Sequence, residues 1–269
     1  MDSGYPYNTI EFADRYHANR PRPPRGVMET IANRATMIGG FIHTVVDLGS
    51  GTGLSTFPWG ATAADVIGVE PSPAMRRVAE RENACDNVRF VEGRAESTGL
   101  PDSLADIVTA SSSMTWFPAS FLNEALRILK PGGLFAAFYP RHPPQIHPQI
   151  DEVFERLVSR VDRLAGFEGG GARTDVDLAK ARDLALLRSC RDVAAPVTEL
   201  SFEHSEVGNA HRVIQFALTS GSLVSLLANG VSRSDLTLDE LEHVSRSVLG
   251  DDPCSWTFQF DLRMAAKRG

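Results

Sequence analysis

The chain has 269 residues, of which 42% are hydrophobic and 23% are charged, and its formal net charge at pH 7 is -7. This length and composition exclude a fibrous or disordered protein and leave room for one large α/β domain. The net negative charge argues against broad contact with nucleic acid phosphates, because such binding needs a basic face. We therefore expect a small-molecule substrate and no nucleic acid partner.

The sequence predicts no targeting or membrane-spanning segment. Its apolar runs are shorter than a membrane span, and the first residues, MDSGYPYNTIEF, lack the basic and apolar regions of a signal peptide. We expect a cytoplasmic protein without a membrane partner, as a monomer or a homodimer. Cys85, Cys190 and Cys254 lie far apart with no C-x-x-C pair, so neither a disulfide framework nor a metal site is expected.

The first half of the chain predicts a lid followed by a sheet. Residues 1–40 contain the proline-rich run RPRPPRG and are expected to form an N-terminal lid. Residues 41–139 alternate short stretches rich in Val, Ile and Phe with helical patterns, which is typical of a parallel sheet with crossover helices. The predicted strands are 44–49, 65–70, 87–93, 105–111 and 133–139, with helices near 72–84 and 120–130.

The second half predicts a helical insertion and then a return to the sheet. Residues 140–194 begin with a proline-broken loop, PRHPPQIHPQ, and continue as helical patterns of an inserted cap. Residues 195–269 supply the remaining core strands and helices, so the whole chain, 1–269, is expected to be a single domain. The patterns predict helices near 150–165, 175–189, 208–229 and 237–249, and strands at 195–207 and 255–267.

A glycine-rich turn follows the first predicted strand in VVDLGSGTGLST, residues 45–56. Gly49, Gly51 and Gly53 stand at every second position behind Asp47. Without a Cβ, such a turn lets the main chain approach a ligand at the carboxyl edge of a parallel sheet. A tight turn with nothing bound is the other interpretation of this motif alone.

The spacing of the glycines and a second carboxylate, Glu70, restrict the class of ligand that this turn can bind. The G-x-G-x-G spacing is neither that of dinucleotide enzymes nor that of a phosphate-binding loop. Glu70 ends the second predicted strand, 17 positions after Gly53, where a carboxylate accepts hydrogen bonds from both hydroxyls of a ribose. We therefore expect an adenosine compound without a pyrophosphate. Its other end should be cationic, because Asp47 lies nearby.

Four motifs in this order resemble the class I S-adenosylmethionine-dependent methyltransferases. They are DLGSGTG (47–53), GVEPS (68–72), FVEGRAE (90–96) and EALRILKPGGLFAAFY (124–139). The outer segments FADRYHANRPRPP and VTASSSMTWFP are similar to the branch of trans-aconitate methyltransferase and other small-molecule methyltransferases. The resemblance implies a Rossmann-like α/β fold, with a mostly parallel seven-stranded sheet and helices on both faces.

The resemblance also implies a cofactor, S-adenosyl-L-methionine, and roles for the residues that match the motifs. The glycines would approach its methionine part and sugar, Asp47 would orient its polar end, and Glu70 would hold the ribose. The other interpretations are a loop cap for Asp47, a solvated strand end for Glu70 and lid packing for Tyr16. The full set of cofactor-binding candidates is Tyr16, Asp47, Gly49, Gly51, Gly53, Glu70, Pro71, Ala95, Glu96 and Ser111.

The sequence departs from the family pattern at three places. Ser112 and Thr115 stand where the branch commonly has Gln and His, which places its substrate chemistry in doubt. Arg94 replaces a frequent aspartate, so the adenine contact is expected from Glu96 or from amides near Ala95. Pro58 and Gly60 interrupt the helix after the glycine turn, and this helix is predicted to be short.

Acceptor-side candidates follow the fourth and fifth predicted strands. His142 and His147 are candidate general bases on the loop after residue 139, or ordinary surface histidines. A carboxylate acceptor would need no base, and Arg141 would anchor it. Trp116 and Phe117 either form an aromatic substrate wall or pack on the following helix.

The predicted reaction is methyl transfer to an O-, N- or C-nucleophile of a small molecule, with release of S-adenosyl-L-homocysteine. The acceptor is expected to be a carboxylate or a natural-product intermediate of secondary metabolism. Two alternatives remain open at this point. The fold can serve a non-methylation reaction on the same cofactor, or the acceptor can be a macromolecule, tRNA or protein.

Overall fold

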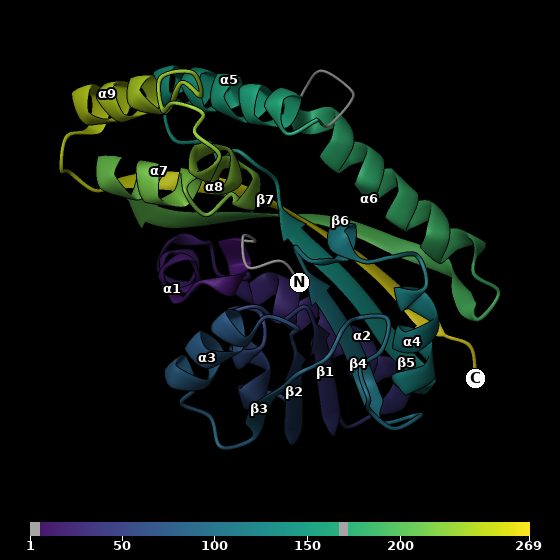
Figure 1. Ribbon diagram of the computed structural model, residues 1–269. Coiled ribbons are helices and arrows are strands. Elements are labelled where there is room, and N and C mark those ends of the chain that lie inside the picture. Colours follow the sequence, from purple (N-terminus) through teal and green to yellow (C-terminus); the bar gives the residue numbers. More distant parts are fainter. Residues whose placement is uncertain (1–5, 167–171) are drawn as a thin grey trace. The chain divides into compact units, whose positions relative to one another are not determined.

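The structure of the chain is a computed structural model that describes residues 6–166 and 172–269 (Figure 1). The chain divides into two compact units. We call them the helical unit (Met1–Pro21, Arg141–Ala179 and Glu203–Gln259) and the sheet unit (Arg22–Pro140, Lys180–Phe202 and Phe260–Gly269).

The sheet unit is built on one seven-stranded sheet with the order β3-β2-β1-β4-β5-β7-β6. The strands are β1 (Thr44–Leu48), β2 (Asp65–Val69), β3 (Val88–Val91), β4 (Ala105–Ser111), β5 (Leu129–Pro140), β6 (Val193–Gly208) and β7 (Cys254–Lys267). The first five pair in parallel, and β5 pairs antiparallel with β7 from Leu134 opposite Ala266 to Pro140 opposite Phe260. The predicted mostly parallel seven-stranded α/β fold is confirmed.

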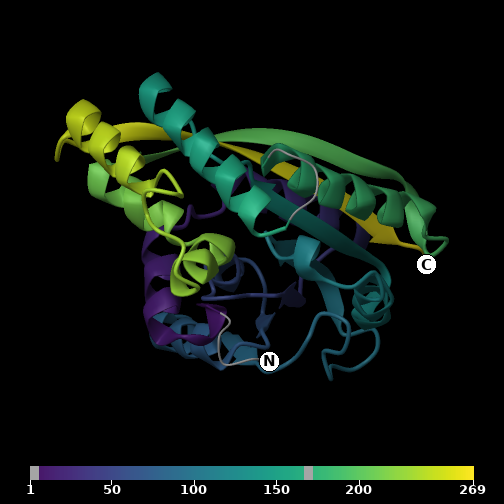
Figure 2. The ribbon, with the colours of Figure 1, turned by 45° about the horizontal axis from the view of Figure 1, so that its top comes forward.

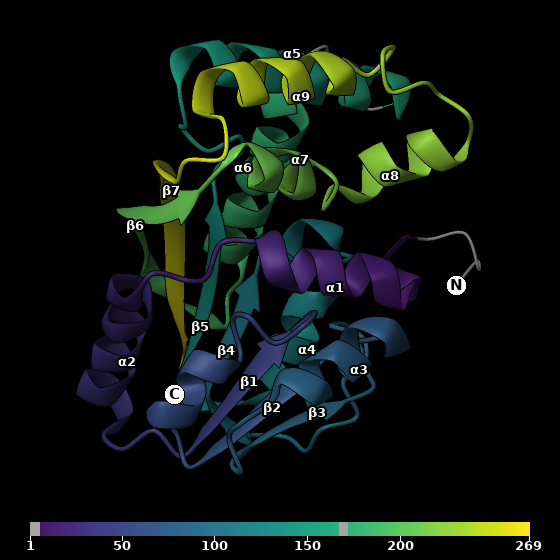
Figure 3. The ribbon, with the colours of Figure 1, turned by 90° about the vertical axis from the view of Figure 1, so that its left-hand side faces the viewer.

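The central strands of the sheet are buried and mostly apolar. All five residues of β1 are buried, as expected for a parallel strand covered on both faces. The amphipathic helix α4 (Phe121–Ile128) packs its apolar side on Val46, Val108 and Phe135. Helix α2 (Arg25–Gly39) contacts β4 and β5 and lies on the other side of the sheet from α4 (Figure 3).

Helix α3 (Pro73–Glu82) packs against β3 and begins at a well-formed N-cap. Ser72 Oγ accepts a hydrogen bond from the amide of Met75 at 3.3 Å, and Pro73 occupies the first turn, where its missing N–H costs nothing. The start of α3 is therefore fixed directly after Glu70, at the carboxyl end of β2.

The helical unit contains η1 (Pro6–Asn8), α1 (Ile10–Asn19), α5 (Pro148–Leu164), α7 (Ala210–Ala217), α8 (Gly221–Ala228) and α9 (Leu238–Leu249). Helices α5 and α9 lie side by side in Figure 1 and again in the turned view of Figure 2. Phe216 of α7 centres an aromatic core with Phe154, Trp256 and Phe258, with ring centroids 5.9–6.1 Å away.

The structure departs from the predicted elements at three points. Strand β5 starts at Leu129, not at residue 133, so the Lys-Pro-Gly-Gly run belongs to the strand. The helical pattern at 208–229 is two helices, α7 and α8, because Ser220 caps a new helix by accepting from the amide of Leu223. Helix α6 (Ala172–Ser189) begins three residues earlier than expected.

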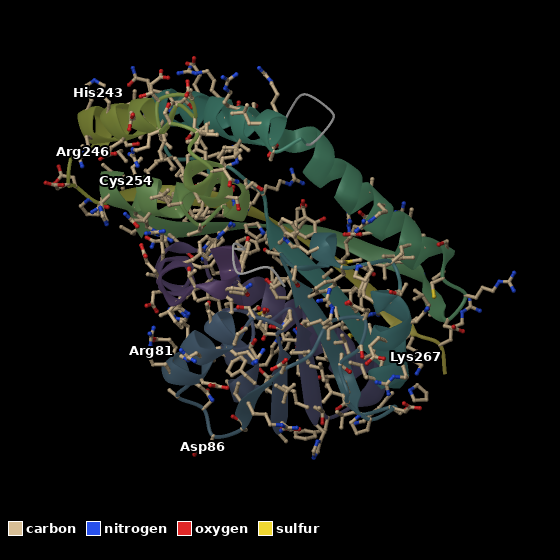
Figure 4. All side chains as sticks on the ribbon, viewed as in Figure 1. Arg81, Asp86, His243, Arg246, Cys254 and Lys267 are labelled. Carbon is tan, nitrogen blue, oxygen red and sulfur yellow. The ribbon has the colours of Figure 1, made fainter. Side chains whose placement is uncertain are left out.

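Three features of the described residues bear on the earlier expectations. No helix among them is long and apolar enough to cross a membrane. Cys85, Cys190 and Cys254 are free cysteines, with Cys254 at the start of β7 (Figure 4). No group of three or more His, Cys, Asp or Glu side chains in residues 6–166 and 172–269 is arranged to hold a metal ion. The lid, cap and single-domain assignments stay predictions.

Candidate functional site

Asp47 holds the glycine-rich loop to the sheet. Its carboxylate is completely buried, and its Oδ2 accepts hydrogen bonds from Ser55 Oγ at 2.8 Å and Thr56 Oγ1 at 2.7 Å. Its Oδ1 accepts from Thr109 Oγ1 of the neighbouring strand β4 at 2.7 Å. These three hydroxyls join the loop, β1 and β4 through a single side chain.

The three loop glycines adopt positive φ angles of 65°, 55° and 85° at Gly49, Gly51 and Gly53. An added Cβ at Gly49 would lie 2.6 Å from Ser113 Cβ, and one at Gly53 would lie 2.4 Å from the ring of Phe57. At Gly51 an added Cβ would meet no heavy atom within 4 Å. Gly51 is thus the glycine at which the loop faces open space, as a ligand-binding main chain requires.

Glu70 links the loop to the start of α3. Its Oε2 accepts from the amide of Gly51 at 3.0 Å, and its Oε1 accepts from the amide of Ser72 at 2.8 Å. Arg76 Nη1 donates to the main-chain oxygen of Glu70 at 2.6 Å. A carboxylate has about four acceptor positions. Two remain for further donors such as the two hydroxyls of a ribose.

Both site carboxylates have altered acidity. Burial raises the pKa of Asp47, and the hydrogen bonds from Thr109, Thr56 and Ser55 lower it in part. Burial likewise raises the pKa of Glu70, while the amides of Ser72 and Gly51 act in the opposite direction. The donors that the fold supplies therefore offset only part of the effect of burial, and the pKa of each carboxylate stays above its ordinary value.

The candidate adenine contacts follow β2 and β3. Ser72 and Met75 are buried at the start of α3, and Pro71 is half-buried beside them. Ala95 is buried in a tight turn in which the amides and carbonyls of Arg94 and Ser97 bond to each other. The Glu96 carboxylate accepts from Arg94 Nε at 2.5 Å; although burial acts to raise its pKa, the bonds from Arg94 and from its own amide lower it.

The segment after β4 lies against the glycine loop. Ser113 Oγ donates to the main-chain oxygen of Leu48 at 2.8 Å. The ring of Phe117 packs on Phe121 at 5.2 Å between centroids, and its Cζ would lie 3.1 Å from a Cβ at Gly49. Trp116 is 59% exposed, and Ser111, the last residue of β4, is half-buried. Phe117 is thus both packed on the following helix and next to the loop.

The remaining candidates belong to the helical unit. Tyr16 packs with Phe12 and Tyr7, and His142 Nε2 lies 2.9 Å from Arg20 Nη1. His147 caps α5, with its Nδ1 accepting from the amide of Gln149 at 3.4 Å. Arg141 is exposed, and its amide donates to the main-chain oxygen of Gln259. A place for Tyr16, Arg141, His142 and His147 beside the glycine loop stays a prediction.

Sequence reasoning missed the hydroxyls that surround Asp47. Ser55 and Thr56 directly follow the glycine loop, and this local signal was available. Thr109 lies 62 residues from Asp47, and only the pairing of β1 with β4 brings it close. The predicted short helix after the loop is confirmed as a five-residue 3-10 turn, η2 (Phe57–Ala61).

Comparisons with known proteins agree on the family. A family model described as a methyltransferase domain matches residues 46–137, which contain the glycine loop, Glu70 and β4. The chain is 31% identical over 127 residues to the uncharacterized methyltransferase YcgJ of Bacillus subtilis, covering 45% of this chain and 48% of that protein. It is 37% identical over 134 residues to trans-aconitate 2-methyltransferase of an Azoarcus species, covering 46% and 48%. Residues 46–137 are thus similar to a methyltransferase domain, in agreement with the resemblance of the motifs to the class I S-adenosylmethionine-dependent methyltransferases.

A solved structure extends the likeness in fold over most of the chain. A type II methyltransferase structure from Anaeromyxobacter dehalogenans matches 91% of this chain and 97% of its own, with a TM-score of 0.67 and 23% identity. The matched part of the chain spans about half of the length of the two curated methyltransferases above. Methyltransferases of this class use S-adenosylmethionine as the methyl donor, and the vacant acceptor positions of Glu70 and the exposed main chain at Gly51 fit that group.

Proposed function

We propose that the chain is an S-adenosylmethionine-dependent methyltransferase that acts on a small-molecule acceptor. The observation that carries the proposal is the Glu70 carboxylate, which joins the Gly51 amide to the start of α3 and keeps two acceptor positions free. Glu70 would hold the ribose of the donor. Gly49, Gly51 and Gly53 would let the main chain lie along its methionine part.

The cofactor supplies an already activated methyl group, so the protein mainly has to bind and align the reactants. Asp47 is a positioning residue in this account, since its oxygens are taken by Ser55, Thr56 and Thr109 and it shapes the loop. Phe117 beside Gly49 would form part of the acceptor wall. Pro71, Ser72 and Met75 would line the adenine, with Ala95, Glu96 and Ser111 at its edge.

Two observations favour a small-molecule acceptor over RNA or protein. The net charge of -7 provides no broad basic face for a polyanion. By their names, two similar proteins act on small molecules: trans-aconitate 2-methyltransferase and erythromycin 3''-O-methyltransferase of Saccharopolyspora erythraea. An RNA gel shift at low salt that is abolished by added salt would instead support the macromolecular alternative.

Whether a general base takes part depends on the acceptor. A carboxylate nucleophile needs no proton removed, whereas an alcohol, amine or carbon acid does. In the helical unit the Nε2 of His142 accepts from Arg20 and the Nδ1 of His147 caps α5, so each imidazole already has one nitrogen engaged. These contacts favour an acceptor that reacts without a base.

Replacement of Glu70 tests the proposal. Glu70→Ala should weaken S-adenosylhomocysteine binding by about 1.5–3 kcal/mol, roughly ten- to hundredfold, because a charged hydrogen-bond partner of the ribose is lost. Isothermal titration calorimetry measures this effect directly.

Glu92→Ala is the matched control. Glu92 pairs with the same Arg76 at 2.8 Å, but its side chain is 77% exposed. This variant should bind the cofactor product as the unaltered chain does. If Glu70→Ala and Glu92→Ala bind equally well, Glu70 does not hold the ribose and the proposed site is wrong.

A further inference from the structure

Arg20 of the helical unit lies between two aromatic rings. Its Cζ is 5.1 Å from the ring centroid of Tyr16 and 5.5 Å from that of Phe216. The imidazole of His142 also lies against Phe216, with 5.5 Å between ring centroids. Stacked rings remove water from a guanidinium and hold its plane, so that any anion meeting its edge is bound more strongly.

No carboxylate among the described residues pairs with Arg20, unlike other arginines of the same unit. Arg15, on the helix α1 that Arg20 caps, bonds to Glu11 at 3.0 Å and to Gln215 at 3.2 Å. Arg212 pairs with Glu206. A stacked and partly desolvated cation without its own counter-ion is unusual, because desolvation of a charge is costly unless a partner compensates it.

The donors of Arg20 are incompletely used. Nη1 lies 2.9 Å from His142 Nε2, and Nη2 donates to the main-chain oxygen of Thr219 at 3.3 Å. The Nε–H is buried and has no hydrogen-bond partner. A guanidinium always donates, so His142 Nε2 must be the acceptor and its ring proton must sit on Nδ1. Neither acceptor carries a negative charge, so these two contacts do not compensate the positive charge of Arg20.

We propose that Arg20, with Tyr16, Phe216 and His142 around it, is a binding site for the carboxylate of a small organic acid. A carboxylate matches the planar fork of a guanidinium through two parallel hydrogen bonds. The aromatic neighbours suit a flat anion and its apolar stem. Arg20 is a different residue from Arg141, which the sequence alone indicated as the acceptor anchor.

The ligand class follows from this site. The ligand is a small carboxylic acid, and Arg20 holds one of its carboxylates as a recognition group. A purely structural Arg20, which only ties α1 to the residues before α8 through Thr219, would require no anion. Arg20→Lys distinguishes the two roles, because lysine keeps the positive charge and lacks the planar fork of the guanidinium.

Calorimetry on the full chain tests the site with defined probes. The probes are acetate, succinate and trans-aconitate, with trans-aconitate trimethyl ester and inorganic phosphate as comparisons. We expect at least one of the acids to bind, the uncharged ester not to bind, and phosphate to bind more weakly than that acid. Arg20→Lys and Arg20→Gln should each weaken acid binding at least about tenfold.

Arg15→Gln is the matched control, because Arg15 lies one turn earlier on α1 and is already paired with Glu11. This variant should bind the acids as the unaltered chain does. Circular dichroism establishes that each variant is folded, and Arg20→Lys keeps the test decisive if Arg20→Gln does not fold. Absence of binding for all the acids, phosphate binding as tight as theirs, or unchanged affinity in Arg20→Lys would overturn the proposal.

S-adenosylhomocysteine, which carries its own carboxylate, distinguishes the source of the anion. Unchanged binding of this ligand in the Arg20 variants, together with weakened acid binding, supports a site for the carboxylate of a separate small acid. Weakened binding of S-adenosylhomocysteine with unchanged acid binding overturns it. If the unaltered chain binds the acids through Arg20 but never binds S-adenosylhomocysteine, the anion site stands and the methyltransferase proposal fails.

Discussion

The glycine loop of the sheet unit and the aromatic cluster of the helical unit each contain a charged side chain, completely buried at Asp47 and partly buried at Arg20, and they satisfy it differently. Asp47 has three hydroxyl donors for its two oxygens and is completely buried. Arg20 has two neutral acceptors and a buried Nε–H with no partner. A carboxylate with side-chain donors on both oxygens maintains local structure, whereas a cation with an unused donor retains capacity for a ligand.

Glu70 lies between these two cases. Two main-chain amides fix its carboxylate, yet it keeps acceptor positions free. Asp47 therefore maintains the local structure of its site, and Arg20 is available to bind a ligand. Glu70 does both.

Removal of the Asp47 carboxylate should have the largest effect on the free energy of unfolding. Asp47→Ala leaves three buried hydroxyls without their acceptor and should lower the free energy of unfolding by on the order of 3 kcal/mol. Asp47→Asn keeps an acceptor and should cost about 1 kcal/mol. Urea denaturation measures both effects.

The control for Asp47 is Asp65→Ala, which removes a carboxylate of β2 that pairs with Arg89 at the surface. Its cost should stay below about 0.5 kcal/mol. Equal costs at Asp47 and Asp65 would show that the hydroxyl cluster does not maintain the loop.

The open side of the loop is tested at Gly51. Gly51→Val should reduce S-adenosylhomocysteine affinity about a hundredfold, because the valine side chain would project where the ligand approaches. Calorimetry measures this loss of affinity.

Gly99→Val is a matched control. Gly99 also has a positive φ, 72°, and open space around an added Cβ. Both variants should lose similar stability from backbone strain. Cofactor binding should fall only at Gly51, and equal binding by both variants would remove the loop from the site.

A smaller change in the free energy of unfolding is expected when Glu124, another carboxylate with donors on both oxygens, is replaced. Hydrogen bonds from Arg127 and Thr98 lower the pKa of Glu124 from 4.5 to about 2. Since the folded pKa lies below the unfolded one, the stabilisation is complete above pH 4.5 and is lost as pH falls towards 2. The pKa of Asp47 is raised instead, so its contribution has the opposite sign.

Glu124→Gln isolates that contribution. The free energy of unfolding, measured by urea denaturation at a series of acidic pH values, should fall less steeply in Glu124→Gln than in the unaltered chain between pH 4.5 and 2. Parallel curves would mean that the bonds from Arg127 and Thr98 do not favour the charged form.

Much of the sheet unit was predictable because its signals are local. Short runs of Val and Ile mark each strand, and the glycines of residues 49–53 mark the turn that follows the first. The position of Glu70 at the end of β2 followed from the same pattern, and the structure places its carboxylate on the loop. The start of β5 was missed, because Leu129 already pairs with Ala105 of β4, and the Lys-Pro-Gly-Gly run forms an irregularity before Leu134 pairs with Ile107.

The sequence by itself determined the order of the elements, the glycine loop and the resemblance to a family, since each depends on residues close together in the chain. Only the tertiary structure decided which groups meet. Thr109 reaches Asp47 across 62 residues, and Arg20 meets His142 across 122 and Thr219 across 199. Residue patterns report local backbone preference, whereas the partner of a buried polar group depends on which distant elements pack together.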